Sequence, residues 1–257
     1  MGRVLSNRLD DIRLSMMLLT RLPVGKKTLG ADATFARALW AYPIAGAVVG
    51  LLAGAVFELA AILHIPVIVA AVLSLAFAVL LTGAVHEDGL ADFCDGIGGG
   101  RDRARKLEIM RDSHIGTYGA SALALSFLLR WSAISAIGLP GRVLLTWIAA
   151  GALSRAAIAV PLLVLSPARS DGLGVQAAFP PVWSAVTAGL IALVIAVLLL
   201  HTGAIVMIAA VLAAALLVTW LAKRHLQGHT GDVLGACALA AEMSAFVAAS
   251  TGWFGHG

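Results

Sequence analysis

Hydrophobic positions in this chain form long, uninterrupted runs. Each run has about the length that a helix needs to cross a hydrocarbon core of roughly 30 Å. The predicted spans are 38–63, 65–85, 119–137, 143–165, 182–200, 203–222 and 233–254. A transmembrane barrel would show short alternating segments instead. The pattern therefore predicts an all-α, polytopic membrane bundle of about seven transmembrane helices, folded as a single domain over residues 1–257.

The segment before the first span has a different pattern. Over residues 4–20, apolar residues such as Leu5, Leu9 and Ile12 alternate with charged and polar ones. This pattern is typical of an amphipathic helix that lies in the membrane interface. We therefore expect an interfacial N-terminal segment over residues 1–30, with the helix ending at the sequence TRLP that follows Leu19.

Composition supports the membrane class. The chain is 60% hydrophobic and only 12% charged, whereas soluble domains carry roughly 25% charged residues. A water-soluble protein of this composition could not cover its surface with polar groups. The two cysteines, Cys94 and Cys237, have no metal-ligand spacing, and we interpret both as free thiols.

Lysine and arginine predict the orientation. They gather before the first span and in the connections after spans two, four and six, whereas the opposite connections contain one cation, Arg142. Cytoplasmic loops carry the excess of these residues. The N-terminus and the three long connections are therefore expected in the cytoplasm.

The connection over residues 86–118 concentrates the charge. It holds seven of the fourteen acidic residues and five of the eighteen basic ones. Asp88, Asp92 and Asp95 are spaced i, i+4, i+7 on what we expect to be a straight continuation of the second span. They would share one helix face, within roughly 10 Å along the axis. A divalent cation would remove their repulsion, and hard oxygen ligands suit Mg²⁺ or Mn²⁺. We predict that all three bind such a cation, with Glu87 as a further ligand or a base.

Glycines and arginines follow the carboxylates. Glycines at 96 and 98–100 are expected to end the helix and to let the backbone approach a phosphate. A short helix is predicted over 101–112. The candidate phosphate-binding residues of this connection are Gly98, Gly99, Arg101, Arg103 and Arg111. Together these residue types favour metal-dependent phosphoryl transfer. The alternative is a solvated loop whose charges only set the topology.

Other polar positions have two interpretations each. Asp112 offers a second metal contact or pairs with the neighbouring arginines. Ser113 contacts a phosphate or caps the next helix. Thr230 and Asp232 lie where the last span begins, on the face that carries the acidic connection. Asp232 either belongs to the same site or caps its own helix, where a carboxylate is favourable.

Charged side chains inside spans are costly and usually functional. Arg155 and Glu242 lie deepest, and we expect both to face the bundle interior and to pair, with Arg155 also facing the substrate. Arg130 and Glu58 lie nearer span ends, from which they are expected to reach the interface.

Motifs distributed along the whole chain are similar to those of a known family. They are Thr20-Arg21-Leu22-Pro23; His86-Glu87-Asp88-Gly89-Leu90-Ala91-Asp92 with Asp95-Gly96 and Gly98-Gly99-Gly100; the run EIMRDSHIGTYG over 108–119; and Thr230-Gly231-Asp232 with Leu234-Gly235-Ala236. In this order they resemble the cobalamin synthase family, the adenosylcobinamide-GDP ribazoletransferases. Two departures are His229, where the family often has Gly, and His114, where it often has Arg.

The resemblance implies a reaction in late vitamin B12 biosynthesis. Adenosylcobinamide-GDP and α-ribazole, or its 5′-phosphate, would give adenosylcobalamin or its 5′-phosphate, with release of GMP. The Asp88, Asp92 and Asp95 carboxylates would hold Mg²⁺ against the diphosphate. Arg21 would add a phosphate contact to those of the acidic connection. A ribazole hydroxyl would attack, with Glu87, Asp95 or Asp232 as base.

The resemblance also implies a setting. We expect the bacterial cytoplasmic (inner) membrane, with the N-terminus and the active site facing the cytoplasm. The partners would be the two substrates, the lipid bilayer, and other enzymes of the pathway or further copies of this chain; no nucleic acid is expected.

Two other functions compete with this one. A CDP-alcohol phosphotransferase of phospholipid synthesis also uses several aspartates and Mg²⁺, but its pattern requires Ala-Arg where this chain has Ala91-Asp92. A small-molecule transporter, with Arg155 and Glu242 along its pathway, belongs to another class. Release of GMP would distinguish transfer from transport.

Overall fold

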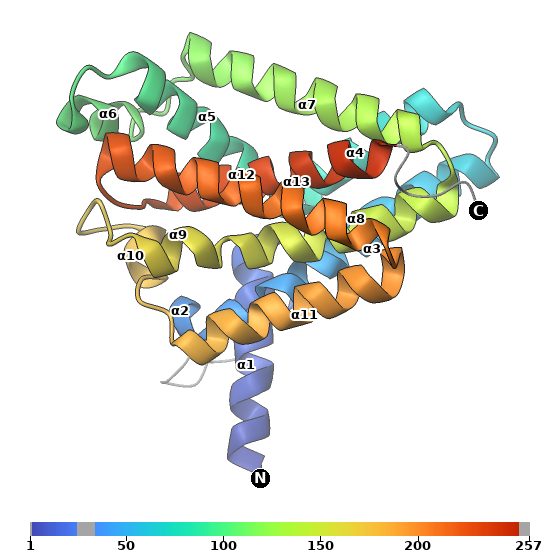
Figure 1. Ribbon diagram of the computed structural model, residues 1–257, viewed down its shortest axis with the longest axis horizontal. Coiled ribbons are helices and arrows are strands. Elements are labelled where there is room, and N and C mark those ends of the chain that lie inside the picture. The colour runs from blue at the N-terminus through green and yellow to red at the C-terminus, as the bar shows by residue number, and fades with distance from the viewer. Residues whose placement is uncertain (1, 25–33, 252–257) are drawn as a thin grey trace.

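The structure is a computed structural model that describes residues 2–24 and 34–251, and every regular element within these residues is helical. Figure 1 shows the long helices side by side, with α1 running across the direction of α7 and α11. The helices are α1 (Gly2–Leu19), α2 (Phe35–Ala38), α3 (Tyr42–Ile62), α4 (Val67–Thr82), α5 (Val85–Gly99), α6 (Arg103–Ile109), α7 (Thr117–Ile137), α8 (Pro140–Ala157), α9 (Ala159–Val164), α10 (Leu173–Gln176), α11 (Val182–Leu200), α12 (Gly203–Leu226) and α13 (Gly231–Ser250), with a 3₁₀ turn at Leu39–Ala41.

The prediction of an all-α membrane bundle is confirmed. Among the described residues, six helical stretches are long and apolar enough to span a membrane, and the bent pair of α4 and α5 makes up to a seventh. The stretches 35–62 and 140–164 each join consecutive short and long helices. The last predicted span ends at Ser250, and residues 252–254 lie outside the described part.

A sharp bend separates α4 from α5. The two axes meet at 88°, so the expected straight continuation of the second span into the acidic motif is wrong. Gly83 and Ala84 both have left-handed backbone angles, with φ of +65° and +58°, and these conformations end one helix and redirect the chain. The Arg21 guanidinium packs over Gly83, and the backbone N–H of Arg21 donates to the Leu81 carbonyl at 2.7 Å. The segment after α1 therefore holds the bend.

Glycines allow α3 and α8 to pack backbone against backbone. Gly46, Gly50 and Gly54 are spaced every four residues and lie on one face of α3. A Cβ atom at Gly46 would overlap the Gly151 carbonyl of α8, and one at Gly50 would overlap the Trp147 carbonyl. Small residues at four-residue spacing are what close helix pairs in membranes require, because backbone approach replaces the hydrophobic effect as the source of attraction.

The predicted N-terminal helix is present and packs through its second half. Leu14, Met16 and Leu19 are buried against the bundle. Asp11 is fully buried, and one of its carboxylate oxygens accepts the Trp40 indole N–H at 2.9 Å. The position of α1 in the interface stays a prediction, and residues 1 and 25–30 of the predicted interfacial segment lie outside the described part.

Candidate active site

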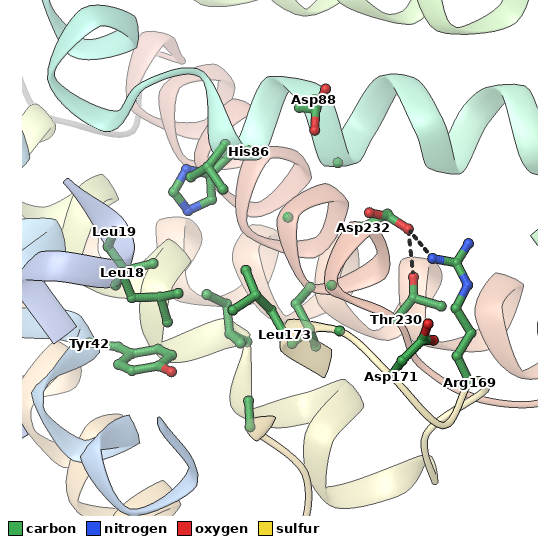
Figure 2. A pocket seen from close by; sticks show the side chains of 18 residues that line it. Leu18, Leu19, Tyr42, His86, Asp88, Arg169, Asp171, Leu173, Thr230 and Asp232 are labelled. Carbon is green, nitrogen blue, oxygen red and sulfur yellow. Dashed lines mark hydrogen bonds and ion pairs between the residues drawn. The ribbon is translucent and has the colours of Figure 1, made fainter. Parts of the chain in front are cut away.

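A cavity of about 250 Å³ lies between the first turns of α5 and α13, close to α1, α3 and the connection that leads into α10. Figure 2 shows Thr230, Asp232, Arg169 and Asp171 gathered on one side of it. Asp88 comes from α5, Thr230 and Asp232 from the start of α13, and Arg169 and Asp171 from the connection before α10. Residues from three distant parts of the sequence therefore share one site.

Two glycines bring α5 and α13 together at this cavity. A Cβ at Gly89 would lie only 3.0 Å from both the Gly235 Cα and the Asp232 carbonyl oxygen. A Cβ at Gly235 would lie 3.2 Å from the Gly89 Cα. Because the backbones touch here, Asp88 and Asp232 reach the same cavity from neighbouring helices.

Thr230, and not Asp232, caps α13. Its hydroxyl oxygen accepts the Val233 N–H at 3.3 Å and its O–H donates to Asp232 Oδ2 at 3.1 Å. The capping role that the sequence left open for Asp232 is thus filled by its neighbour. The same Asp232 oxygen lies 3.4 Å from the Arg169 guanidinium. Asp232 is consequently oriented at the cavity by one hydroxyl and one cation.

The three predicted metal ligands have different surroundings. Asp88 is exposed at the cavity and Asp92 is half-buried, whereas Asp95 is buried. The charges of Asp88, Asp232 and Asp95 all act against the ionised form of Asp92. The repulsion that the spacing predicted is therefore present, and Asp232 adds to it.

Asp95 has a contact that its spacing did not reveal. Its two carboxylate oxygens accept the backbone N–H groups of Gly116 and Gly119, each at 2.8 Å. These amides belong to the first turn of α7, so Asp95 satisfies the N-terminus of that helix from α5. The capping role that was open for Ser113 falls to Asp95. Metal binding by Asp95 stays a prediction.

The donor set is compatible with a magnesium ion held partly by substrate. Within residues 2–24 and 34–251, no group of three or more His, Cys, Asp or Glu side chains is arranged to hold a metal ion by itself. Mg²⁺ is usually bound by one or two carboxylates together with phosphate oxygens and water. Asp88 and Asp232 line the cavity, and Asp92 is close enough to both for their charges to act on it; these carboxylates fit that requirement.

Glu87 belongs to a buried network of charges. Arg130 of α7 donates to Glu87 at 3.1 Å and to Glu242 of α13 at 3.2 Å, and Arg155 of α8 also pairs with Glu242. The predicted pairing of Arg155 with Glu242 is confirmed. The expectation that Arg130 reaches the interface is wrong, since it is 1% exposed. The carboxylates of Glu87 and Glu242 neutralise its charge inside the bundle, so the Arg130 side chain does not need to reach the membrane interface.

The helix α5 ends within the predicted glycine run. Gly96, Gly98 and Gly99 are still helical, and Gly100 is the first extended residue after the helix. A Cβ at Gly98 would lie 2.6 Å from the Tyr118 ring, so this glycine makes room for an aromatic side chain. Gly99 and Asp112 line a second hollow of about 350 Å³ near the start of α7. Phosphate binding by Gly98 and Gly99 stays a prediction.

The arginines of the acidic connection differ in the groups that they contact. Arg103 donates to the Leu226 carbonyl at 2.7 Å and to the Ala168 carbonyl at 3.0 Å, which ties α6 to two other connections. Arg111 pairs at 2.6 Å with Asp171 of the cavity. Arg101 is exposed just before α6. The short helix predicted over 101–112 is confirmed as α6, with narrower bounds.

Two titratable groups beside the site are shifted. Hydrogen bonds from the His114 ring and backbone N–H hold the pKa of Asp112 below its usual range. Burial lowers the pKa of His229, whose backbone N–H and carbonyl bind Ser166 and Ala168. The His229 backbone therefore joins the connection that carries Arg169 to the start of α13.

Comparison with known proteins shows the family to which the chain belongs. The family model described as cobalamin-5-phosphate synthase matches residues 11–250. The chain belongs to the cobalamin-5-phosphate synthase family. The resemblance carried by the motifs is thus confirmed, and membership over nearly the whole chain weighs against both a CDP-alcohol phosphotransferase and a transporter.

Relatives of this family are similar over nearly their whole length. A protein named adenosylcobinamide-GDP ribazoletransferase from Bradyrhizobium diazoefficiens is 46% identical over 231 residues, covering 90% of this chain and 89% of the relative. Proteins of the same name from Mesorhizobium japonicum and Azorhizobium caulinodans are 41% and 42% identical, over 94% and 90% of this chain and 93% and 91% of the relatives. No solved structure matches the chain significantly.

Sequence reasoning missed several residues at the cavity of this family member. Arg169 was counted only as a cation that sets topology, and Asp171, His86 and Tyr42 were not singled out. A signal was present for the first two, because Arg169 and Asp171 are the charged residues of the connection between α9 and α11. His86 and Tyr42 carried no such signal, since isolated aromatic and imidazole side chains in apolar helices are usually packing residues.

Proposed function

We propose that this chain joins adenosylcobinamide-GDP to α-ribazole, or to its 5′-phosphate, and releases GMP. The product would be adenosylcobalamin or its 5′-phosphate, in late vitamin B12 biosynthesis. Family membership supports the reaction class. The observation that carries the assignment to a site is the cavity that Asp88, Asp232 and Arg169 share. Carboxylates and a guanidinium converge there, as transfer between phosphate esters requires.

In the proposed reaction a ribazole hydroxyl oxygen bonds to the phosphorus that carries the cobinamide. The bond from that phosphorus to the bridging oxygen of GMP breaks, and GMP leaves with the electron pair. Three carboxylates were candidates to accept the hydroxyl proton. Glu87 is buried against Arg130, and both oxygens of Asp95 accept amide N–H groups. Asp232 lines the cavity, and its contacts with Thr230 and Arg169 both use one oxygen, Oδ2. We therefore assign the base to Asp232.

The remaining polar groups would bind the diphosphate. Asp88 and Asp92 would hold Mg²⁺, which supplies charge neutralisation at the diphosphate when bound. Arg169 lines the cavity and Arg111 pairs with Asp171, which also lines it; these positions support a role for both arginines in binding phosphate oxygens. Arg21 lies at the bend before α5, where its exposed side chain would add a contact.

The proposed location is the bacterial cytoplasmic membrane, with the N-terminus and the cavity facing the cytoplasm. The distribution of lysine and arginine supports this orientation. Assembly with other enzymes of the pathway or with further copies of the chain would bring the polar substrates to a membrane-bound site. Cysteine accessibility on the two sides of sealed vesicles measures the orientation directly.

Release of GMP tests the reaction. Purified protein in detergent, with Mg²⁺, adenosylcobinamide-GDP and α-ribazole, is expected to form GMP and adenosylcobalamin. Asp88→Asn and Asp92→Asn should abolish turnover, and Asp232→Asn should reduce it by about 100-fold or more, as expected for loss of a general base. Asp10→Asn is a matched control, because Asp10 pairs with Arg13 on α1, far along the helix from the cavity. Absence of GMP with the wild-type protein would refute the proposal.

A further inference from the structure

The cavity has a second end with different chemistry. Figure 2 shows Leu18, Leu19 and Tyr42 on the side away from Asp232 and Arg169, with the His86 ring projecting from α5 toward them. Ile158, Leu173 and Leu234 are further apolar residues that line the cavity. The apolar lining comes from α1, α3, α10, α13 and the junction between α8 and α9. A ligand that fills the whole cavity must therefore be apolar at one end and polar at the other.

The size of the cavity limits its occupant. Pockets for drug-sized ligands measure roughly 300 to 1,000 Å³, and this one measures about 250 Å³. The corrin ring of the cobinamide substrate is a large macrocycle that exceeds this space. The aromatic bases of the proposed reaction that are small enough are the guanine of GDP, the adenine of the adenosyl group and the base of the acceptor nucleoside.

The apolar end offers few hydrogen-bond partners. The Tyr42 hydroxyl already donates its proton to the Phe35 carbonyl at 3.3 Å, so a ligand in the cavity finds its ring and an acceptor oxygen, and no free donor. His86 is 3% exposed, and its Nδ1 atom is buried with no hydrogen-bond partner among the described residues. Guanine and adenine each carry several donors and acceptors on their edges, and most of them would be left unpaired here at considerable cost. A flat ring with few polar atoms fits instead.

We propose that the apolar end binds the aromatic base of the acceptor nucleoside, with His86 forming a hydrogen bond to a ring nitrogen. The proposal rests on the proposed function and assigns the acceptor to one part of the site. With the base against Leu18, Leu19 and Tyr42, the ribose extends toward Asp88 and Asp232. A ribose hydroxyl then lies near Asp232, the proposed general base. The diphosphate of the other substrate approaches from the side of Arg169.

Steady-state kinetics with each substrate varied in turn test the assignment. Leu18→Asn and Leu173→Asn place a polar group at the apolar end and should raise the KM for α-ribazole about 10-fold or more, with the KM for adenosylcobinamide-GDP changed less than about twofold. Met17→Asn is the matched control. It introduces the same side chain one position away on α1, where Met17 is 51% exposed and does not line the cavity.

His86→Phe tests the hydrogen bond while keeping a ring of similar shape. It should raise the KM for α-ribazole about 10-fold, because the ring nitrogen of the base is then buried without a partner. The unfolding temperature in detergent should change little, which separates this effect from misfolding. An increase in the KM for adenosylcobinamide-GDP instead would place a purine of that substrate at the apolar end and overturn the proposal. Unchanged KM values for both substrates would do so as well.

A binding measurement separates this inference from the proposed function. Isothermal titration of the protein with α-ribazole alone requires no turnover. Binding to the wild type that weakens in Leu18→Asn and not in Met17→Asn supports the site even if GMP release fails. If the wild type forms GMP but Leu18→Asn binds α-ribazole as tightly as the wild type does, the assignment of the apolar end is refuted and the proposed reaction is not.

Discussion

Glu87 of α5 and Arg130 of α7 form an ion pair of 3.1 Å inside the bundle, where their side chains are 8% and 1% exposed. Glu87 directly precedes Asp88 at the cavity. The other terminal nitrogen of the Arg130 guanidinium pairs with Glu242 of α13. One guanidinium on α7 therefore links α7 to α13 and to α5, the helix that carries the acidic motif.

Removal of Arg130 should destabilise the protein strongly. Arg130→Met leaves Glu87 buried without its cation, whereas Glu242 keeps Arg155. Breaking one partner of a buried pair costs about 3–5 kcal/mol. Thermal unfolding in detergent is the measurement. The double variant Glu87→Gln/Arg130→Met removes the orphaned charge and should recover a large part of the loss; a double variant no more stable than the single one would show that Glu87 is not the group left unpaired.

Asp95 should contribute to stability in a way that Asp88 does not. Asp95→Ala removes the acceptor for two amide N–H groups at the start of α7, and loss of a helix cap costs about 0.5–2 kcal/mol. Asp88 lies in the first turn of α5, the helix that also carries Asp95, but it is exposed at the cavity. The Asp88→Ala variant should therefore unfold at nearly the wild-type temperature. Equal unfolding temperatures for the two variants would contradict the capping role.

Arg101 and Arg103 should differ although they are two residues apart. Arg101→Ala is expected to raise the KM for adenosylcobinamide-GDP more than it lowers kcat, as for a residue that binds phosphate uniformly in ground and transition states. Arg103→Ala removes two hydrogen bonds to carbonyl oxygens and should lower the unfolding temperature. An unchanged KM in Arg101→Ala would assign that residue to topology alone.

The contact between α3 and α8 should tolerate no side chain. A methyl group at Gly151 would overlap the Gly46 carbonyl, so Gly151→Ala must separate the two helices and should cost about 1–3 kcal/mol. Gly189→Ala in α11 is the matched control, because no atom lies within 4 Å of its added Cβ. There the substitution should be neutral or stabilise by up to about 1 kcal/mol, since alanine favours the helix. Unfolding temperatures of the two variants give the comparison.

The sequence by itself determined the class of the protein, most of its helix boundaries and its family. Hydrophobic length is a local property, so spans such as 182–200 are visible without any knowledge of their neighbours. The spacing of Asp88, Asp92 and Asp95 is equally local, and their mutual repulsion follows from helix geometry alone. The motif residues marked the family because they are recognised in order along the chain.

Only the tertiary structure decided which carboxylates face the same cavity. The bend at Gly83 and Ala84 and the contact of Gly89 with Gly235 set the position of α5. That placement brings Asp88 to Asp232, and it turns Glu87 inward to Arg130. Partners across helices depend on how closely backbones approach and on where a helix changes direction, and neither follows from the period of hydrophobic residues along one segment.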